Sequence, residues 1–252
     1  MLEPPQLLTG SSPTMWRVRR ASTCWERSAT GQHICLGPDT CGMVRRWTGV
    51  AISGAVAYVA IDFVLALADP QYSLIRNAES DYGVGPNAWL MDVNFLLRGA
   101  FSVAAIIAIA LTTTPRGRSR LGLALIGAWA CCSALLAFFP DNPVGTPVTP
   151  PGRIHLLLAG IAFAAVATGA LLISHRIGAD PSWRSRRRAL LVVSLLAIVA
   201  GALVILSIRR SLADFGLYER IFLGLEILWI VLASRAAWVV GRSGPRKEAA
   251  TS

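Results

Sequence analysis

The sequence predicts an all-α, polytopic membrane protein: a six-transmembrane-helix bundle whose termini are both cytoplasmic. Of its 252 residues, 54% are hydrophobic and only 15% are charged, and the mean hydropathy is +0.54. Soluble domains need a more polar surface than this composition can supply. The apolar residues also come in blocks of about 19 or more, which is long enough to cross a hydrocarbon core about 30 Å thick. Arginines gather beside alternate ends of these blocks.

Each apolar block is expected to be a helix, because backbone polar groups inside lipid have to be paired within their own segment. In chain order the blocks span residues 47–68, 89–111, 121–139, 154–174, 189–208 and 217–240. Together they predict one six-helix membrane domain over residues 43–241, followed by a cytoplasmic tail at 242–252.

Residues 1–42 differ from everything that follows. They mix Pro, Gly, Ser, Thr and Arg without a periodic apolar face, so we expect a disordered leader. A compact alternative start lies at Met43, just before two arginines and an interfacial tryptophan, and a misassigned gene start is one explanation for the leader. The proline-rich loop at 140–153 holds five prolines in fourteen residues and is expected to be stiff and not helical.

The basic residues predict the orientation of the bundle. One set of helix ends carries thirteen of them: Arg45, Arg46, Arg116, Arg118, Arg120, Arg176, Arg184, Arg186, Arg187, Arg188, Arg242, Arg246 and Lys247. The opposite set carries five: Arg76, Arg153, Arg209, Arg210 and Arg220. By the positive-inside rule the side with thirteen basic residues is cytoplasmic and includes both termini. We expect an integral, multi-pass protein of the plasma membrane. Membrane lipids are the expected partners, and the position of the arginines beside helix ends argues against nucleic-acid binding.

The cysteines and acidic residues do not predict a metal centre. Of the five cysteines, two are adjacent inside the third block and three lie in the leader, with no zinc-site spacing. Glu79, Asp81 and Asp141 likewise lack the spacing of a calcium or magnesium site. We therefore expect no metal and no cofactor.

Polar residues inside the apolar blocks are the candidate functional residues, because burying a charge in lipid costs at least about 2.5–3.5 kcal/mol. The expected buried polar cluster consists of Asp62, Asp92, Asn94, Arg98 and Glu226. Arg98 and Glu226 each lie roughly 14 Å below the external surface at 1.5 Å per residue. We expect Arg98 to form a neutral ion pair with Glu226 or Asp62, and Asn94, one turn earlier on the same face, to orient the guanidinium.

A second set of residues is expected to form an acidic rim at the external mouth of the bundle: Glu79, Ser80, Asp81, Asp141, His155, Glu219 and Arg220. Two simpler interpretations stand beside a binding role. Ser80 or Asp81 is suited to N-cap a glycine turn. His155 is either a capped interfacial histidine or a proton acceptor beside Asp141.

Three runs of residues resemble a known family: "PQYSLIRNAESDYGVGPNAWLMDVNFLLRG", "FFPDNP" followed by "GRIH", and "YERIFLGLEILW". Over about residues 44–241 the chain resembles the domain of unknown function 998 family, a group of uncharacterised six-helix bacterial membrane proteins. The positions that match are Ser80, Asp81, Gly83, Asn94, Gly99, Pro140, Asp141, His155, Glu219 and Arg220. The resemblance implies a fold and a location but no established activity. This chain has Glu79 where the family pattern has a hydrophobic residue, so its loop is expected to be more polar.

Three classes of function follow from these patterns. The leading prediction is binding or transport of a lipid headgroup, ion or small solute through an external-facing polar cavity. One alternative is an intramembrane hydrolase or transferase that modifies lipids with His155 and Asp141, although no zinc-protease motif, GxSxG elbow or phosphate loop occurs in the sequence. The other alternative is a structural or assembly protein, in which an Arg98 pair would only hold the second helix against the sixth.

Overall fold

A computed structural model describes residues 38–142 and 146–242, and within these ranges the regular structure is helical, without strands. Its elements are α1 (Pro38–Ala68), η1 (a 3-10 helix, Glu79–Val84), α2 (Ala88–Thr112), α3 (Arg120–Leu136), α4 (Pro150–Arg176), η2 (Ile177–Ala179), α5 (Arg184–Arg210) and α6 (Phe215–Arg242). Five helices of the described ranges, α1, α2, α4, α5 and α6, are long and apolar enough to cross a membrane, and α3 is a shorter apolar helix of 17 residues. The chain is therefore an integral membrane protein.

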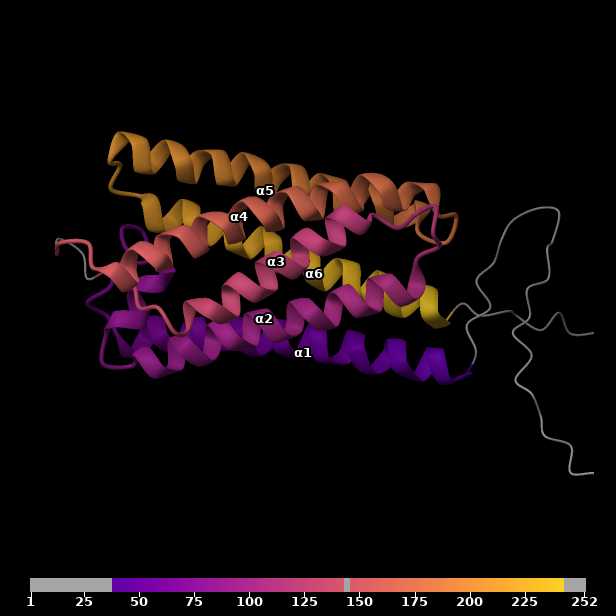
Figure 1. Ribbon diagram of the computed structural model, residues 1–252, viewed down its shortest axis with the longest axis horizontal. Helices are drawn as coiled ribbons and strands as arrows, with labels where there is room; N and C mark the ends of the chain where they lie inside the picture. Colours follow the sequence, from indigo (N-terminus) through magenta and orange to yellow (C-terminus); the bar gives the residue numbers. More distant parts are fainter. Residues whose placement is uncertain (1–37, 143–145, 243–252) are drawn as a thin grey trace, which may run out of the picture.

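The six α-helices form one bundle in which each helix packs against its neighbours in the sequence (Figure 1). The last helix, α6, returns against α1 and α2 and so closes the bundle. The start of α1 and the end of α6 lie at the same end of the bundle, which we call the terminal end. The opposite end carries η1 and the segments 69–87 and 137–142, and we call it the η1 end. Which end faces the cytoplasm stays a prediction.

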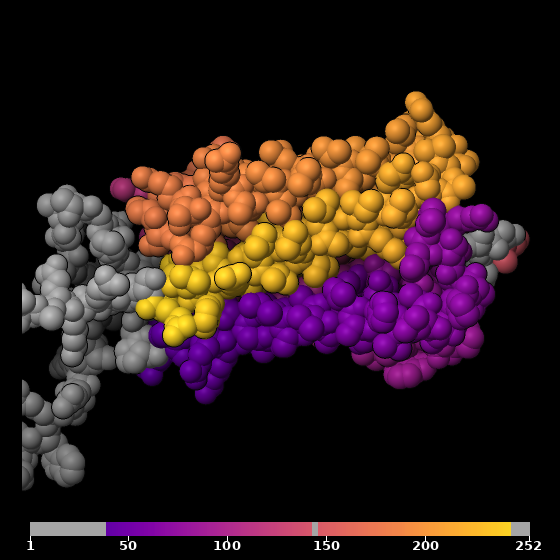
Figure 2. Space-filling view, turned by 180° about the vertical axis from the view of Figure 1, so that it is seen from behind, coloured from indigo at the N-terminus to yellow at the C-terminus, as the bar shows by residue number. Residues whose placement is uncertain are grey.

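The polarity of this bundle is the reverse of that of a soluble protein. Large apolar side chains such as Phe63 on α1, Leu157 on α4 and Ile205 on α5 are 59–65% exposed. Arg98 and Glu226, in contrast, are 2% and 0% exposed. Figure 2 shows α1, α6 and α5 side by side on one face of the bundle. An apolar outside, with charged side chains kept in the interior among apolar ones, is the arrangement that a lipid solvent favours.

Glycines allow α3 to approach both of its neighbours closely. A Cβ on Gly99 of α2 would lie 2.8 Å from the carbonyl oxygen of Ala130 on α3. Gly122 of α3 and Gly169 of α4 approach each other in the same way, since a Cβ on either would lie 3.0 Å from the carbonyl oxygen of the other. Small residues at helix contacts are typical of membrane bundles, where close backbone packing provides much of the attraction.

Several helices extend beyond the apolar blocks that predicted them. α1 begins at Pro38, nine residues before Trp47, and so includes the last residues of the expected leader. The rest of the expected leader, residues 1–37, lies outside the described residues, as do residues 243–252 of the expected tail. The prediction that all of 140–153 is not helical was wrong, because α4 begins at Pro150. Pro150 and Pro151 occupy the first turn, where a helix needs no backbone donor. α3 ends at Leu136, three residues before the expected end.

Asp180 joins the two connections at the terminal end. Its side chain is 0% exposed and accepts hydrogen bonds from the backbone N–H of Thr114 at 2.8 Å and of Ser182 at 2.9 Å. The indole of Trp183 donates to the carbonyl of Thr112 at 3.0 Å beside it. These bonds fix the α2–α3 connection against the α4–α5 connection.

Candidate functional site

Arg98 lies inside the bundle on α2, in an environment of hydroxyl groups and aromatic rings. Its Nε donates to Ser133 Oγ on α3 at 3.2 Å, and its Nη1 lies 3.5 Å from the hydroxyl of Tyr58 on α1. The guanidinium carbon is 4.7 Å from the ring centre of Trp129 and 5.1 Å from that of Phe95. Cation–π contacts of this kind stabilise a cation that has been removed from water.

The expected ion pair of Arg98 with Glu226 or Asp62 is wrong, because the structure forms neither pair. Within the described residues, the ion pair that reaches 4 Å joins His155 to Asp141 instead. The error has a geometric cause. Counting residues along each helix gives the depth of a side chain but not its direction about the helix axis. Arg98 is directed toward α1 and α3, while Glu226 has neither carboxylate oxygen in a hydrogen bond.

A chain of contacts connects Arg98 with two glutamates at the η1 end. The Tyr58 hydroxyl, which faces Arg98, donates to Glu79 Oε1. The backbone N–H of Glu79 donates to Glu219 Oε2 on α6 at 2.7 Å. Glu79 and Glu219 are only 3% and 6% exposed. Both had been expected on an open rim, but η1 folds Glu79 inward against α6, and the guanidinium reaches this carboxylate through Tyr58.

A small cavity lies where these groups meet. Its volume is about 20 Å³, which is room for about one water molecule. Its polar lining comes from Glu79, Ser80, Arg98, His155 and Glu219, and its apolar lining includes Phe95 and Phe163. Four helices and η1 contribute to the wall of the cavity, which lies inside the η1 end of the bundle.

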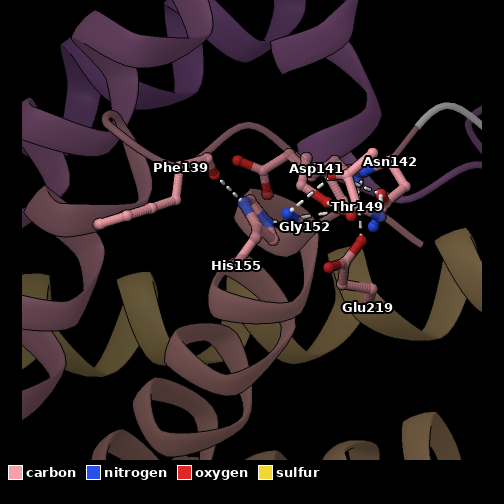
Figure 3. A network of polar contacts seen from close by, with 9 residues as sticks. Phe139, Asp141, Asn142, Thr149, Gly152, His155 and Glu219 are labelled. Carbon is pink, nitrogen blue, oxygen red and sulfur yellow. Dashed lines mark hydrogen bonds and ion pairs between the residues drawn. The ribbon is translucent and has the colours of Figure 1, made fainter.

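The edge of the cavity holds the imidazole ring of His155 in a fixed orientation. Its Nδ1 donates to the carbonyl of Phe139 at 2.7 Å, and its Nε2 lies 3.5 Å from Asp141 Oδ2. Ser80 donates its hydroxyl hydrogen to the same oxygen of Asp141 at 2.8 Å. Figure 3 shows the imidazole between Phe139 and Asp141, with Glu219 of α6 facing the same region. A hydroxyl, a carboxylate and an imidazole thus lie together. The sequence predicted the contact of His155 with Asp141 but not the contact of Ser80 with Asp141.

The loop that covers the cavity is fixed to the start of α6. Arg220 Nη1 donates to the carbonyls of Asn77 at 2.6 Å and Leu74 at 3.1 Å. The backbone N–H of Leu217 donates to the carbonyl of Ile75 at 3.0 Å. Gly216 is required at this contact, because a Cβ there would lie 2.0 Å from the carbonyl oxygen of Asn77. Arg220 therefore holds the loop, and it does not line the cavity.

Asp81 is part of the same loop and does not line the cavity. It is 5% exposed and accepts a hydrogen bond from the side-chain amide of Asn77 at 2.9 Å. Burial raises the pKa of the Asp81 carboxyl above its ordinary range, although the bond from Asn77 opposes that shift. Neither Ser80 nor Asp81 makes an N-cap, because η1 begins after Ala78 without a side-chain cap.

The remaining members of the expected buried cluster do not gather at the cavity. Asn94 is fully buried, and its amide oxygen and nitrogen have no hydrogen-bond partner, so it does not orient Arg98. Asp62 is partly buried, with Oδ1 unpartnered. Asp92 is partly buried and makes no hydrogen bond or ion pair with another described side chain. The sequence did not single out Tyr58, although a tyrosine one turn before Asp62 in an apolar block was an available signal.

Among the described residues, the side chain types that ligate metals do not gather at this site. Within the described ranges there is no group of three or more His, Cys, Asp or Glu side chains that could hold a metal ion. The polar groups around the cavity instead provide one guanidinium, two carboxylates, a hydroxyl and an imidazole. These groups can bind charged and hydrogen-bonding parts of an organic molecule.

The family was identified by comparison with known proteins. A family model described as "Protein of unknown function (DUF998)" matches residues 52–236. The match extends over well more than half of the chain and includes every residue that lines the cavity. No curated protein and no solved structure matches the chain. The chain belongs to the DUF998 family, as its motifs predicted.

Proposed function

We propose that this DUF998 protein binds a small zwitterionic group, with an acidic and an ammonium part, in the cavity beneath η1. The observation that carries the proposal is a buried Arg98 that lines a small cavity without a carboxylate within ion-pair distance. A buried guanidinium is costly unless an anion pairs with it. The acidic part of a ligand would supply that anion.

The two glutamates favour a zwitterion over a simple anion. Glu79 and Glu219 line the same cavity as Arg98, so a ligand with negative charge alone would be repelled by their carboxylates. A ligand with positive charge alone would be repelled by Arg98. A zwitterion places its acidic part at Arg98 and its ammonium part at the glutamates, within the same cavity.

The volume of the cavity implies that the structure represents a closed form. About 20 Å³ admits one water molecule and not an organic ligand. We propose that η1 moves outward to admit the ligand. This motion would break the contacts of Glu79 with Tyr58 and Glu219 and that of Ser80 with Asp141. The preceding loop would stay on α6 through the bonds of Arg220 to Asn77 and Leu74.

A lipid headgroup and a free solute share this chemistry, and a binding experiment distinguishes the two sources. Thermal unfolding of the full-length protein would be measured with free glycine, with phosphoethanolamine, and in nanodiscs with and without phosphatidylethanolamine. We expect a zwitterion to raise the midpoint of unfolding, while inorganic phosphate and ethylamine leave it unchanged. Stabilisation by the nanodisc lipid alone would assign a headgroup, and stabilisation by glycine or phosphoethanolamine would assign a solute.

An arginine elsewhere on the surface provides the matched control. Arg98→Gln should abolish the shift, whereas Arg235→Gln should keep it, because Arg235 lies exposed on α6 away from the cavity. Size-exclusion chromatography would show that both variants fold. Equal binding by native protein and Arg98→Gln, or binding of phosphate alone, would refute the proposal.

A second candidate function is hydrolysis or transfer of an acyl group. The Ser80 hydroxyl, the Asp141 carboxylate and His155 Nε2 lie at the cavity edge, and this contact favours it. The Ser80 hydroxyl donates to Asp141 and not to the imidazole, so the nucleophile–base contact that would activate a serine is not formed. Labelling of Ser80 by a fluorophosphonate, lost in His155→Gln, would favour this function over binding alone.

A further inference from the structure

Glu226 is a buried carboxyl group that the cavity does not use. It lies eleven residues after the start of α6 and sixteen before its end, near the middle of the helix. Its exposed fraction is 0%, and neither carboxylate oxygen has a hydrogen-bond partner in the described part of the protein. An intramembrane acid without a partner is the kind of group that marks an ion or proton pathway.

The helices packed against α6 leave Glu226 without a compensating charge. On the half of the facing elements nearer the η1 end, the titratable or charged side chains are these: Tyr58 and Asp62 of α1, Asp92 and Arg98 of α2, Arg153 and His155 of α4, Glu79, Asp81 and Tyr82 of η1, and Arg209 and Arg210 of α5. None of them forms a hydrogen bond or ion pair with Glu226. On α5, residues 189–208 include no ionisable side chain. An ionised carboxylate in this environment would be expensive, and a bound proton removes that cost.

Glu226 shares a helix face with the cavity glutamate. Glu219 lies seven residues earlier on α6, two turns and roughly 10 Å along the axis. The buried residues Phe222 and Leu223 lie between them in the sequence of α6, and Leu223 lines the cavity whereas Glu226 does not. Toward the terminal end, the buried hydroxyl of Ser234 is also unpartnered.

We propose that Glu226 is a proton-binding site in the membrane interior that exchanges its proton with water at the η1 end. The carboxylate takes one proton from water that enters through the cavity, by way of Glu219, and returns it by the same route. Exchange requires the movement that opens η1, so the proton is held while the bundle is closed. This site does not depend on which ligand the cavity binds.

Labelling with dicyclohexylcarbodiimide tests the site, because this apolar reagent modifies protonated carboxyl groups in apolar surroundings. The native protein would be labelled in vesicles and the adducts located by peptide mass spectrometry. We expect an adduct on Glu226 and none on Asp39, which lies exposed at the terminal end. The adduct should disappear in Glu226→Gln, which keeps the shape of the neutral acid and should fold normally. Failure of Glu226 to react at any pH would overturn the proton site.

The direction of exchange is tested in sealed vesicles that hold the protein in one orientation. The pH on the two sides is set separately before the reagent is added. Labelling of Glu226 should decrease when the pH is raised on the η1 side and should not respond to the terminal side. A response to the terminal side, or to neither side, would overturn exchange through the cavity. Labelling of Glu226 in a protein that binds no zwitterion would keep the proton site while refuting the proposed ligand.

Discussion

The Tyr58 hydroxyl lies 3.5 Å from Nη1 of Arg98, between the buried guanidinium and the carboxylate of Glu79, to which it donates. A neutral phenol therefore connects the guanidinium to the carboxylate in place of a direct ion pair. Removing that hydroxyl takes from Glu79 Oε1 its donor and leaves Arg98 with Ser133 and the aromatic rings. Tyr58 therefore helps to position the charged residues that line the cavity.

Tyr58→Phe should lower the stability of the protein by about 1–3 kcal/mol, the typical cost of leaving a buried polar group unsatisfied. The midpoint of thermal unfolding in detergent would measure the loss. Tyr72→Phe is the matched control, because Tyr72 is only partly buried and lies in the loop after α1. A similar midpoint for native protein and Tyr58→Phe would mean that the contact with Glu79 contributes nothing.

Arg98 and Glu226 should behave as independent residues in a double-mutant cycle. Because they form no ion pair, the effects of Arg98→Leu and Glu226→Leu on unfolding free energy should add to within about 0.3–0.5 kcal/mol. Tyr58→Phe and Glu79→Leu, which remove the donor and the acceptor of one hydrogen bond, should instead show a coupling of about 0.5–3 kcal/mol. A large coupling energy between Arg98 and Glu226 would support the ion pair that the sequence predicted and contradict the structure.

Gly216→Ala should release the loop from α6, because the new Cβ would lie 2.0 Å from the carbonyl oxygen of Asn77. We expect a loss of about 1–3 kcal/mol in stability, as in other overpacked sites. Gly224, on the same helix, has nothing within 4 Å of an added Cβ. Gly224→Ala should therefore be neutral or stabilising by up to about 1 kcal/mol. Equal effects of the two substitutions on the unfolding midpoint would contradict the close approach.

The raised pKa of Asp81 predicts a pH dependence with a definite sign. Burial raises this pKa in the folded protein, so between the unfolded and folded values the native state binds more protons than the unfolded state. Stability should then fall as pH rises through that window and stay lower above it. Asp81→Asn keeps an oxygen acceptor for Asn77 and removes the charge, so the fall in unfolding midpoint should be smaller in this variant. A steeper fall in Asp81→Asn than in the native protein would contradict the sign.

The helices could be predicted from the sequence because long apolar blocks leave few alternatives in lipid. Their ends were less predictable. Pro38–Arg46 lies outside the apolar block but continues α1, and Pro150 starts α4 because proline suits a first turn. The orientation of the bundle, read from the arginines, stays a prediction.

The site could be predicted in part. Arg98 was selected as a charged group in an apolar block, and Glu219 and His155 as members of the external rim, and the structure brings all three to one cavity. Their partners could not be predicted, since spacing along a helix does not determine which neighbour a side chain faces. Glu79 was assigned to an open rim because a loop residue is usually exposed, but η1 turns it inward. Tyr58 was missed because it carries no charge.

The shortness of α3 has a consequence for the surrounding lipid. Its 17 residues extend roughly 26 Å, compared with a hydrocarbon core about 30 Å thick. A spanning helix of this length would be accommodated by local thinning of the bilayer, or by flanking residues that reach the interface, at a modest energetic cost. The last residue of the helix, Leu136, also lines the cavity. Thinning beside α3 would bring the headgroup layer toward the side of the bundle nearest Arg98.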